Sequence, residues 1–502
     1  MAHNHMTSFA ETSIDPTLNT PLYWQLYNHL RTTILTGHLK PGTKLPSTRA
    51  LADQLHVSRN TVLNAYEQLI AEGYLESIEA SGTFVAAVLP DQLLTTPNAT
   101  PANPGKQTAA RQPRLSKIGE AFLATPAPVA PWITSRSEKP RAFRTGVPAF
   151  DAFPFDLWAK LVDRQARYAT GHAFDYQDPA GYRPLREAIA DHVTVTRRVR
   201  CTADQIIMVA GSQGGLDLVA RLLLNPGDAV WLEDPGYPGA RGTFLGAGAK
   251  LVPVPVDQEG LVVEAGINLC PDARLIYLTP SHQFPLGVTM SLARRLAVLD
   301  WAKRSGAYIL EDDYDSEYRF AGRSLAALQG LDEANCVIYS GTFSKVLFPA
   351  LRVGYLILPL PLVDAFLAAR RFIDIHPPLL EQAVLTAFIS EGHFGRHLRR
   401  MRNLYAERRS TLFKALADLP LTLDAAETGM HCIGWLPDQM NDQAVARQAA
   451  QHDVDVTPIS RFGLKPRPRP GLMLGYASVN EQAIWAGAQR LALAIRTTGT
   501  II

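Results

Sequence analysis

The stretch Val337-Ile338-Tyr339-Ser340-Gly341-Thr342-Phe343-Ser344-Lys345 places a lysine directly after a short apolar run that is typical of a buried strand. Hydroxyl side chains surround this lysine, and Arg352 follows further along the chain. Upstream, Ile309-Leu310-Glu311-Asp312-Asp313-Tyr314 ends a second apolar run with acids. Because side chains alternate along a strand, we expect Asp312 and Tyr314 on one face, with Glu311 and Asp313 on the other.

This combination suits a phosphorylated aldehyde cofactor with a ring nitrogen. A lysine amine can form a Schiff base with the aldehyde, and a buried carboxylate can hold the protonated ring nitrogen. Hydroxyls and Arg352 can bind the phosphate, as can the glycine-rich change from strand to helix in Val209-Ala210-Gly211-Ser212-Gln213-Gly214-Gly215. Each feature alone is more often structural than functional. Their joint occurrence in this order favours a site for pyridoxal 5′-phosphate (PLP).

The region around these motifs, residues 142–500, alternates short apolar runs with helical patterns. Such alternation predicts an α/β fold in which helices cover both faces of a mostly parallel sheet. The runs that we interpret as strands are 206–209, 229–232, 275–278, 308–310 and 337–339.

Residues 20–88 have a different organisation. A helical pattern from Leu22 stops before Gly37, a second helix with Ser47 as its N-cap runs through Leu55, and a third spans residues 59–72. Two short strands around a turn follow, at 73–75 and 81–85. Between Arg31 and Arg59 the charged side chains are basic except for Asp53, as expected for a surface that faces phosphates. The pattern predicts a winged helix-turn-helix, with an ordinary solvated helical bundle as the alternative.

Composition limits the remaining possibilities. The 502 residues carry a formal net charge of only +2, so bulk charge gives no case for nucleic acid. The four cysteines have no CxxC spacing, which argues against a zinc site or a disulfide scaffold, and we expect no metal. No apolar run reaches a membrane span and no signal peptide is recognised, so we expect a cytoplasmic protein. We expect residues 1–19 to be a disordered tail and 89–141 to be a Pro-rich, locally basic linker.

Two parts of the chain resemble known families. The segments Leu45-Pro46-Ser47-Thr48-Arg49-Ala50-Leu51-Ala52 and Val57-Ser58-Arg59-Asn60-Thr61-Val62 resemble GntR-type winged-helix regulators. Residues 142–497 resemble fold-type-I aminotransferases, and the fusion as a whole resembles the MocR-type transcriptional regulators. On the DNA side, the resemblance implies contacts by Ser47, Arg49, Ser58, Arg59 and Thr61, and by Thr83 at the tip of the wing.

The same resemblance implies roles around the cofactor. Lys345 would form the Schiff base, Asp312 would bind the ring nitrogen, Tyr314 the ring hydroxyl, and Tyr237 would stack on the ring. The phosphate would be held by Ser212, Gln213, Thr342, Ser344 and Arg352. Tyr176 matches a tyrosine that reaches the phosphate of the partner subunit, which implies a homodimer, expected from the family to be head-to-tail.

Two positions depart from working aminotransferases. Phe284 stands where the family usually has an asparagine that contacts the ring hydroxyl, and Met473 aligns with the arginine that clamps a substrate carboxylate; Arg241 or Arg461 could supply that charge instead. These departures favour a sensor of PLP or a PLP-reactive amine, linked to vitamin B6 synthesis or salvage, with no expected turnover beyond residual transamination. The alternatives are an active aminotransferase with an accessory DNA-binding module and a PLP-free dimerisation scaffold.

Overall fold

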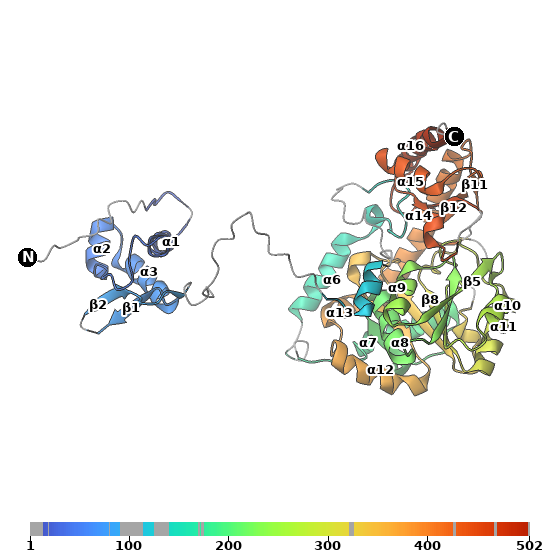
Figure 1. The fold of residues 1–502 in the computed structure, drawn as a ribbon, viewed down its shortest axis with the longest axis horizontal. Coiled ribbons are helices and arrows are strands. Elements are labelled where there is room, and N and C mark those ends of the chain that lie inside the picture. Colours follow the sequence, from blue (N-terminus) through green and yellow to red (C-terminus); the bar gives the residue numbers. More distant parts are fainter. Residues whose placement is uncertain are drawn as a thin grey trace, which may run out of the picture. The chain divides into compact units, whose positions relative to one another are not determined.

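The computed structural model describes residues 14–18, 20–79, 81–90, 114–124, 140–168, 171, 175–320, 326–424, 428–465 and 469–499. The chain divides into two compact units, residues 1–113 and 114–502, and each is described by itself (Figure 1). Within the described ranges, we find no helix with both the length and the apolar character needed to cross a membrane.

The N-terminal unit is a three-helix domain with a hairpin. Its helices are α1 (Leu22–Leu35), α2 (Thr48–Leu55) and α3 (Arg59–Ala71), and its strands are β1 (Leu75–Ile78) and β2 (Gly82–Val85). Ser47 caps α2 by accepting from the Ala50 N–H at 3.2 Å, and Ser58 caps α3 by accepting from the Thr61 N–H at 3.1 Å. Gly82, at φ +117°, turns the hairpin. The predicted winged helix-turn-helix is therefore confirmed.

A large mixed sheet forms the centre of the second unit. Its strands follow the order β3-β10-β9-β8-β7-β4-β5-β6, and β9, β8, β7, β4 and β5 run parallel. β10 is antiparallel to both neighbours and β6 is antiparallel to β5. The strand bounds are β3 Ile206–Val209, β4 Ala229–Asp234, β5 Lys250–Asp257, β6 Gly260–Leu261, β7 Leu275–Leu278, β8 Tyr308–Asp313, β9 Val337–Thr342 and β10 Gly354–Ile357. The α/β fold and mostly parallel sheet are as predicted.

Both faces of this sheet are buried under helices. Along β4, Val230 and Leu232 join one core cluster while Trp231 joins another on the opposite face. This alternation explains why the strands read as continuous apolar runs rather than alternating ones. The helices before and around the sheet are α6 Phe155–Arg167, α7 Arg183–Arg197, α8 Gly211–Leu223, α9 Pro238–Gly246, α10 Val263–Leu269, α11 Leu292–Ser305, α12 Leu360–Ile373 and α13 Leu379–Ser390.

A smaller antiparallel sheet completes the unit, close to the C-terminus (Figure 1). Its order is β11-β12-β14-β13; α15 contacts β13 and β14, and α16 packs on α14 and α15. The bounds are β11 Thr422–Leu423, β12 His431–Trp435, β13 Thr457–Pro458, β14 Gly471–Gly475, α14 His393–Ala415, α15 Asp442–Gln451 and α16 Glu481–Gly499.

The stretch interpreted as a linker contains a helix, α5 (Lys117–Ala124), which packs on α9 of the large domain. An added Cβ at Gly246 would come within 2.2 Å of the Phe122 ring, so the glycine lets this ring lie directly on α9. Sequence reasoning saw only the proline-rich composition here. Within the stretch interpreted as a tail, Ile14 packs against the winged-helix core and the Asp15 N–H donates to Gln25.

Candidate PLP and DNA sites

Lys345 follows the carboxyl end of β9 and is half-buried. Its Nζ donates to the Gly146 carbonyl at 3.0 Å. Burial lowers the pKa of Lys345, and Arg352 acts in the same direction, while Asp315 and Asp312 oppose the change. A lowered pKa favours the neutral amine, which is the form that attacks an aldehyde.

Asp312 lies at the carboxyl end of the neighbouring strand β8 and is 5% exposed. Tyr277 donates to its Oδ2 at 2.7 Å, whereas its Oδ1 is buried with no hydrogen-bond partner among the described residues. Burial raises the pKa of Asp312 to about 7. A buried acceptor without a donor fits the N–H of a protonated pyridine ring, which would satisfy Oδ1 and stabilise the carboxylate.

The other acids of β8 point away from this pocket. Glu311 accepts the backbone N–H groups of Leu328 and Gln329. Asp313 accepts from Arg197 and Tyr339, both at 2.7 Å. Of the three acids of β8, Asp312 therefore faces the pocket. Glu311 and Asp313 hold the strand in place through their hydrogen bonds.

The proposed phosphate-binding residues meet where β3 leads into α8. Gly211, at φ +72°, begins α8, and Ser212 and Gln213 follow in its first turn. Arg352 lies against this turn, and its Nη2 donates to the Ala210 carbonyl at 2.9 Å. An added Cβ at Gly211 would come within 2.7 Å of the same guanidinium, so a glycine is needed there.

Polar atoms without partners also mark this corner. The Gln213 Oε1 and Ser344 Oγ atoms are buried with no hydrogen-bond partner among the described residues. Thr342 Oγ1 accepts from the Ser344 N–H at 3.2 Å. Helix N–H groups, hydroxyls and a guanidinium are the donors that bind a phosphate, so these residues fit that part of PLP.

Three aromatic side chains, those of Tyr237, Phe284 and Tyr314, pack against one another. Tyr237 precedes α9, and its ring meets that of Phe284 edge to face at 5.6 Å between centroids. Phe284 also contacts Tyr314, with centroids 6.1 Å apart. Burial raises the pKa of Tyr314 well above its usual value, so its phenol keeps its hydrogen. The structure thus brings Tyr237 and Tyr314 together across Phe284.

Met473 is buried in an apolar cluster beside the site. The cluster consists of Ile433, Ile459, Phe462 and Met473, with Phe284, Leu286 and Trp435 packed against it. On β14, Met473 pairs with Ile433 of β12, so its side chain stands on the face covered by this cluster. Met473 itself carries no charge, and the cation that the structure places against this cluster is Arg469, whose guanidinium lies 4.7 Å from the centroid of the Trp435 ring.

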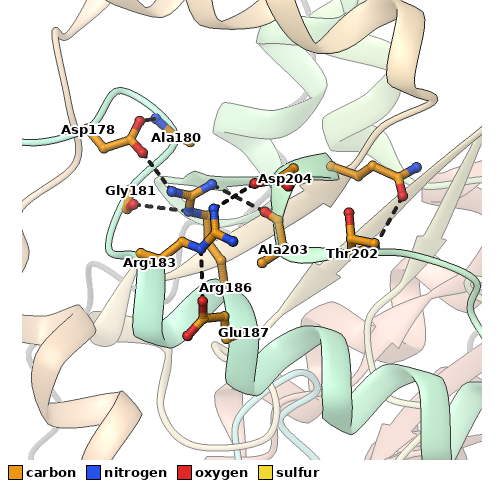
Figure 2. Close-up of polar contacts among 10 residues, drawn as sticks. Asp178, Ala180, Gly181, Arg183, Arg186, Glu187, Thr202, Ala203 and Asp204 are labelled. Carbon is orange, nitrogen blue, oxygen red and sulfur yellow. Dashed lines mark hydrogen bonds and ion pairs between the residues drawn. The ribbon is translucent and has the colours of Figure 1, made fainter.

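Tyr176 is the one expected cofactor residue that stands apart from the rest. Its side chain is 77% exposed, and its ring meets His376 with centroids 6.0 Å apart. The loop that follows it is anchored by buried Arg186, which donates to the Gly181 and Ala203 carbonyls and pairs with Asp178 (Figure 2). Tyr176 is therefore exposed on its own subunit, next to a loop that Arg186 anchors.

Sequence reasoning missed two residues of the site, Tyr277 and Gly146. Tyr277 lay within a predicted strand, and a tyrosine in an otherwise aliphatic run was a usable signal, because its buried hydroxyl needs a partner. Gly146 lies almost 200 residues from Lys345 in sequence, and no local pattern connects the two positions.

The residues expected to contact DNA lie on the first unit. Arg49 and Arg59 are exposed at the starts of α2 and α3, and Arg59 Nε lies 3.5 Å from Thr48 Oγ1. Ser47 and Ser58 are occupied as N-caps, and the Ser58 and Thr61 hydroxyls lie 2.8 Å apart. The half-buried Thr83 accepts the Leu45 N–H through its carbonyl, which fixes the wing to the preceding segment.

Comparison with known proteins agrees with this division. Residues 143–491 match the family of aminotransferases of class I and II, and residues 22–85 match the bacterial regulatory proteins of the gntR family. The fold is shared with the α-aminoadipate aminotransferase LysN of Thermus thermophilus, solved with a phosphopyridoxyl-leucine. The TM-score is 0.69 at 28% identity, covering 77% of this chain and 98% of that one. Fold and site therefore define an aminotransferase-like domain joined to a DNA-binding winged helix.

Relatives that match nearly the whole chain show which family the protein belongs to. A probable rhizopine catabolism regulatory protein of Rhizobium meliloti is 42% identical over 97% of both chains. The pyridoxine biosynthesis regulator PdxR of Corynebacterium glutamicum is 32% identical over 95% of this chain and 97% of its own. The regulator TauR of Rhodobacter capsulatus is 34% identical over 92% of this chain and 94% of its own. The chain belongs to the MocR-type transcriptional regulators.

Proposed function

We propose that this protein is a transcriptional regulator whose aminotransferase-like domain binds PLP and senses either PLP itself or an amine that reacts with it. One observation carries the proposal: the buried Asp312 Oδ1 and Ser344 Oγ atoms have no hydrogen-bond partner among the described residues, and Ser344 directly precedes Lys345. This site shares a chain with a winged helix whose Arg49 and Arg59 are exposed. A buried unsatisfied carboxylate oxygen is costly, and a bound ring N–H would remove that cost.

In this proposal each group of PLP has its own partners. Lys345 holds the aldehyde carbon, Asp312 the ring nitrogen, Tyr314 the ring hydroxyl and Tyr237 the ring face. The phosphate is held by Ser212, Gln213, Thr342, Ser344 and Arg352. Bound PLP supplies an electrophilic carbon and an electron-accepting ring, which together make the site reactive towards primary amines.

The apolar cluster around Met473 bears on the effector. A guanidinium–carboxylate pair contributes roughly 1.5–3 kcal/mol, and Met473 cannot form one. We therefore infer that the effector is PLP itself or an amine without a carboxylate, rather than an amino acid. The name of the C. glutamicum relative supports vitamin B6 synthesis or salvage as the regulated process. Phe284 and Met473 together disfavour efficient transamination.

The proposal includes the assembly and the place of action. We propose a homodimer, head-to-tail, in which outward-facing Tyr176 reaches the phosphate of the partner subunit. The regulator would act in the bacterial cytoplasm, at operator DNA of the nucleoid. The three relatives named above are bacterial, and their names describe regulatory proteins.

The test uses the purified full-length protein. With PLP it should turn yellow, absorbing above roughly 400 nm, and borohydride should fix the cofactor covalently to Lys345. Lys345→Ala should lose the covalent link, whereas Lys303→Ala, in the last turn of α11, should keep it. A wild-type protein that stays colourless with excess PLP contradicts the cofactor assignment.

The regulatory half is tested separately with DNA from upstream of the protein's own gene. Binding should be sequence-specific, and PLP or a titrated amine should change its affinity at fixed salt. Unchanged affinity with every such compound, in a protein that does bind PLP, contradicts the sensing role and leaves the cofactor assignment standing.

A further inference from the structure

A second group of buried polar side chains lies behind Tyr314 and has no role in the account above. His282 is 2% exposed and Asp315 is 1% exposed. The His282 Nδ1 atom lies 2.9 and 3.0 Å from the two Asp315 oxygens and 3.0 Å from the Tyr314 hydroxyl oxygen. One ring nitrogen therefore serves both a carboxylate and a phenol.

The position of the hydrogen in this group follows from its partners. A deprotonated Nδ1 would turn its lone pair towards two carboxylate oxygens, which only accept hydrogen bonds. The hydrogen must therefore sit on Nδ1, shared between Asp315 and the Tyr314 oxygen. Tyr314 then accepts through its oxygen, and its own phenolic hydrogen is left to donate elsewhere.

We propose that His282 and Asp315 are a positioning pair that orients Tyr314 so that its hydroxyl donates to the ring oxygen of the cofactor. This inference rests on the proposed binding of PLP. The oriented Tyr314 hydroxyl would make the hydrogen bond that an asparagine usually makes in the aminotransferases that the domain resembles. Phe284 stands at that position here, and its side chain offers no hydrogen bond. Asp315 fixes the tautomer of His282, and His282 fixes the orientation of the Tyr314 hydroxyl. That hydroxyl then donates to the ring oxygen of the cofactor.

The backbone at position 429 leaves room for the side chains of His282 and Asp315. Gly429, at φ +84°, faces both side chains, and an added Cβ would lie 2.1 Å from His282 Cε1 and 2.7 Å from Asp315 Oδ2. A side chain at position 429 would push the pair apart. The glycine is therefore part of the same arrangement.

A metal ion is the competing interpretation, because ligand atoms of His282, Asp315 and His431 lie within 4.8 Å of one another. His282 Nδ1 and Asp315 are at hydrogen-bond distance, and His431 Nε2 lies 3.1 Å from the Pro285 carbonyl, to which it donates. All three residues therefore already use a nitrogen or a carboxylate oxygen in a hydrogen bond. The arrangement favours a hydrogen-bonded group, and the expected absence of a metal stays a prediction.

The test is a double-mutant cycle on PLP binding by the full-length protein. His282→Leu removes the Nδ1 donor, and Tyr314→Phe removes the group that it orients. Each should weaken PLP affinity roughly three- to tenfold and change the ratio of the absorbance bands of the bound cofactor in the same direction. The double variant should be no worse than Tyr314→Phe alone, because His282 acts through that hydroxyl.

Two further variants guard against misfolding. His282→Asn places an amide N–H near the position of Nδ1 and should restore most of the affinity, and Asp315→Asn should reproduce the defect of His282→Leu in milder form. Additive losses in the double variant, or an unchanged spectrum in His282→Leu, would overturn the inference. A wild type that fails to bind PLP would instead remove the proposed function on which it rests.

Discussion

At the residue scale, the charge of Asp312 decides much of what the pocket does. Its carboxyl is buried, and burial raises its pKa from 3.8 to about 7. A carboxyl with a raised folded-state pKa stabilises the fold at low pH, and this stability is lost as pH rises from 4 through 7. The ionised Asp312 carboxylate therefore destabilises the cofactor-free fold at and above neutral pH, until a cation binds Oδ1.

A stability measurement checks this. Asp312→Asn removes the titrating group but keeps an acceptor for Tyr277, so the cofactor-free variant should gain stability over the cofactor-free wild type as pH rises from 5 to 8. The gain should reach at most about 4 kcal/mol at pH 8. Thermal unfolding of both proteins at several pH values measures it. Asp217→Asn, an exposed α8 variant, should show no such trend; a flat difference for Asp312→Asn would contradict the prediction.

At the element scale, α3 combines stability and recognition in its first turn. Ser58 caps the helix and lies beside Arg59, the first residue of the helix that we propose for DNA recognition. Ser58→Ala should lower stability by roughly 1 kcal/mol, because the cap is lost. Ser58→Asp should keep the cap but bring a negative charge towards DNA phosphates, so it should fold normally and bind DNA poorly. Equal DNA affinity of a well-folded Ser58→Asp protein would place this turn away from DNA.

The two exposed arginines of the winged helix give a second prediction at this scale. If Arg59 makes a bidentate base contact, Arg59→Ala should cost roughly 1–3 kcal/mol of specific binding. Lys40→Ala and Lys44→Ala, which would remove phosphate contacts, should instead weaken binding to all DNA sequences alike. They should also lower the dependence of affinity on salt concentration. Arg304→Ala, on α11 of the other unit, is the control. Unchanged specific binding by the Arg49→Ala/Arg59→Ala double variant would be incompatible with these roles.

The elements also show how far the sequence could be interpreted. Helix caps and apolar periodicity are local, so α1, α2 and α3 were predictable almost to the residue, as were the central strands. The contacts of Lys345 with Gly146 and of Tyr314 with His282 join distant segments, and no periodicity encodes them. Helix α5 was missed because prolines dominate its surroundings, although Ile118 and Phe122 are spaced four apart.

At the scale of the whole molecule, a ligand can act on DNA binding only through its different affinity for two arrangements of the protein. If PLP changes operator affinity by some factor, operator DNA must change PLP affinity by the same factor. We expect PLP to change the operator affinity, and operator DNA to change the PLP affinity by the same factor. Operator titrations with and without PLP, and PLP titrations with and without operator, at one salt concentration, measure them. Equal operator affinity in both forms would exclude PLP as the effector and turn attention to amines.

The contact of Phe122 with Gly246 sets the length of the tether that joins the two halves of the chain. If the whole of 89–141 were free, it could span about 180 Å at full extension. With α5 seated on α9, the winged helix is attached through residues 91–113 alone, which reach no more than about 80 Å. In a dimer, that shorter tether limits how far apart two operator half-sites can lie and still be held together. It leads into α5, which packs on α9, the helix that Tyr237 precedes.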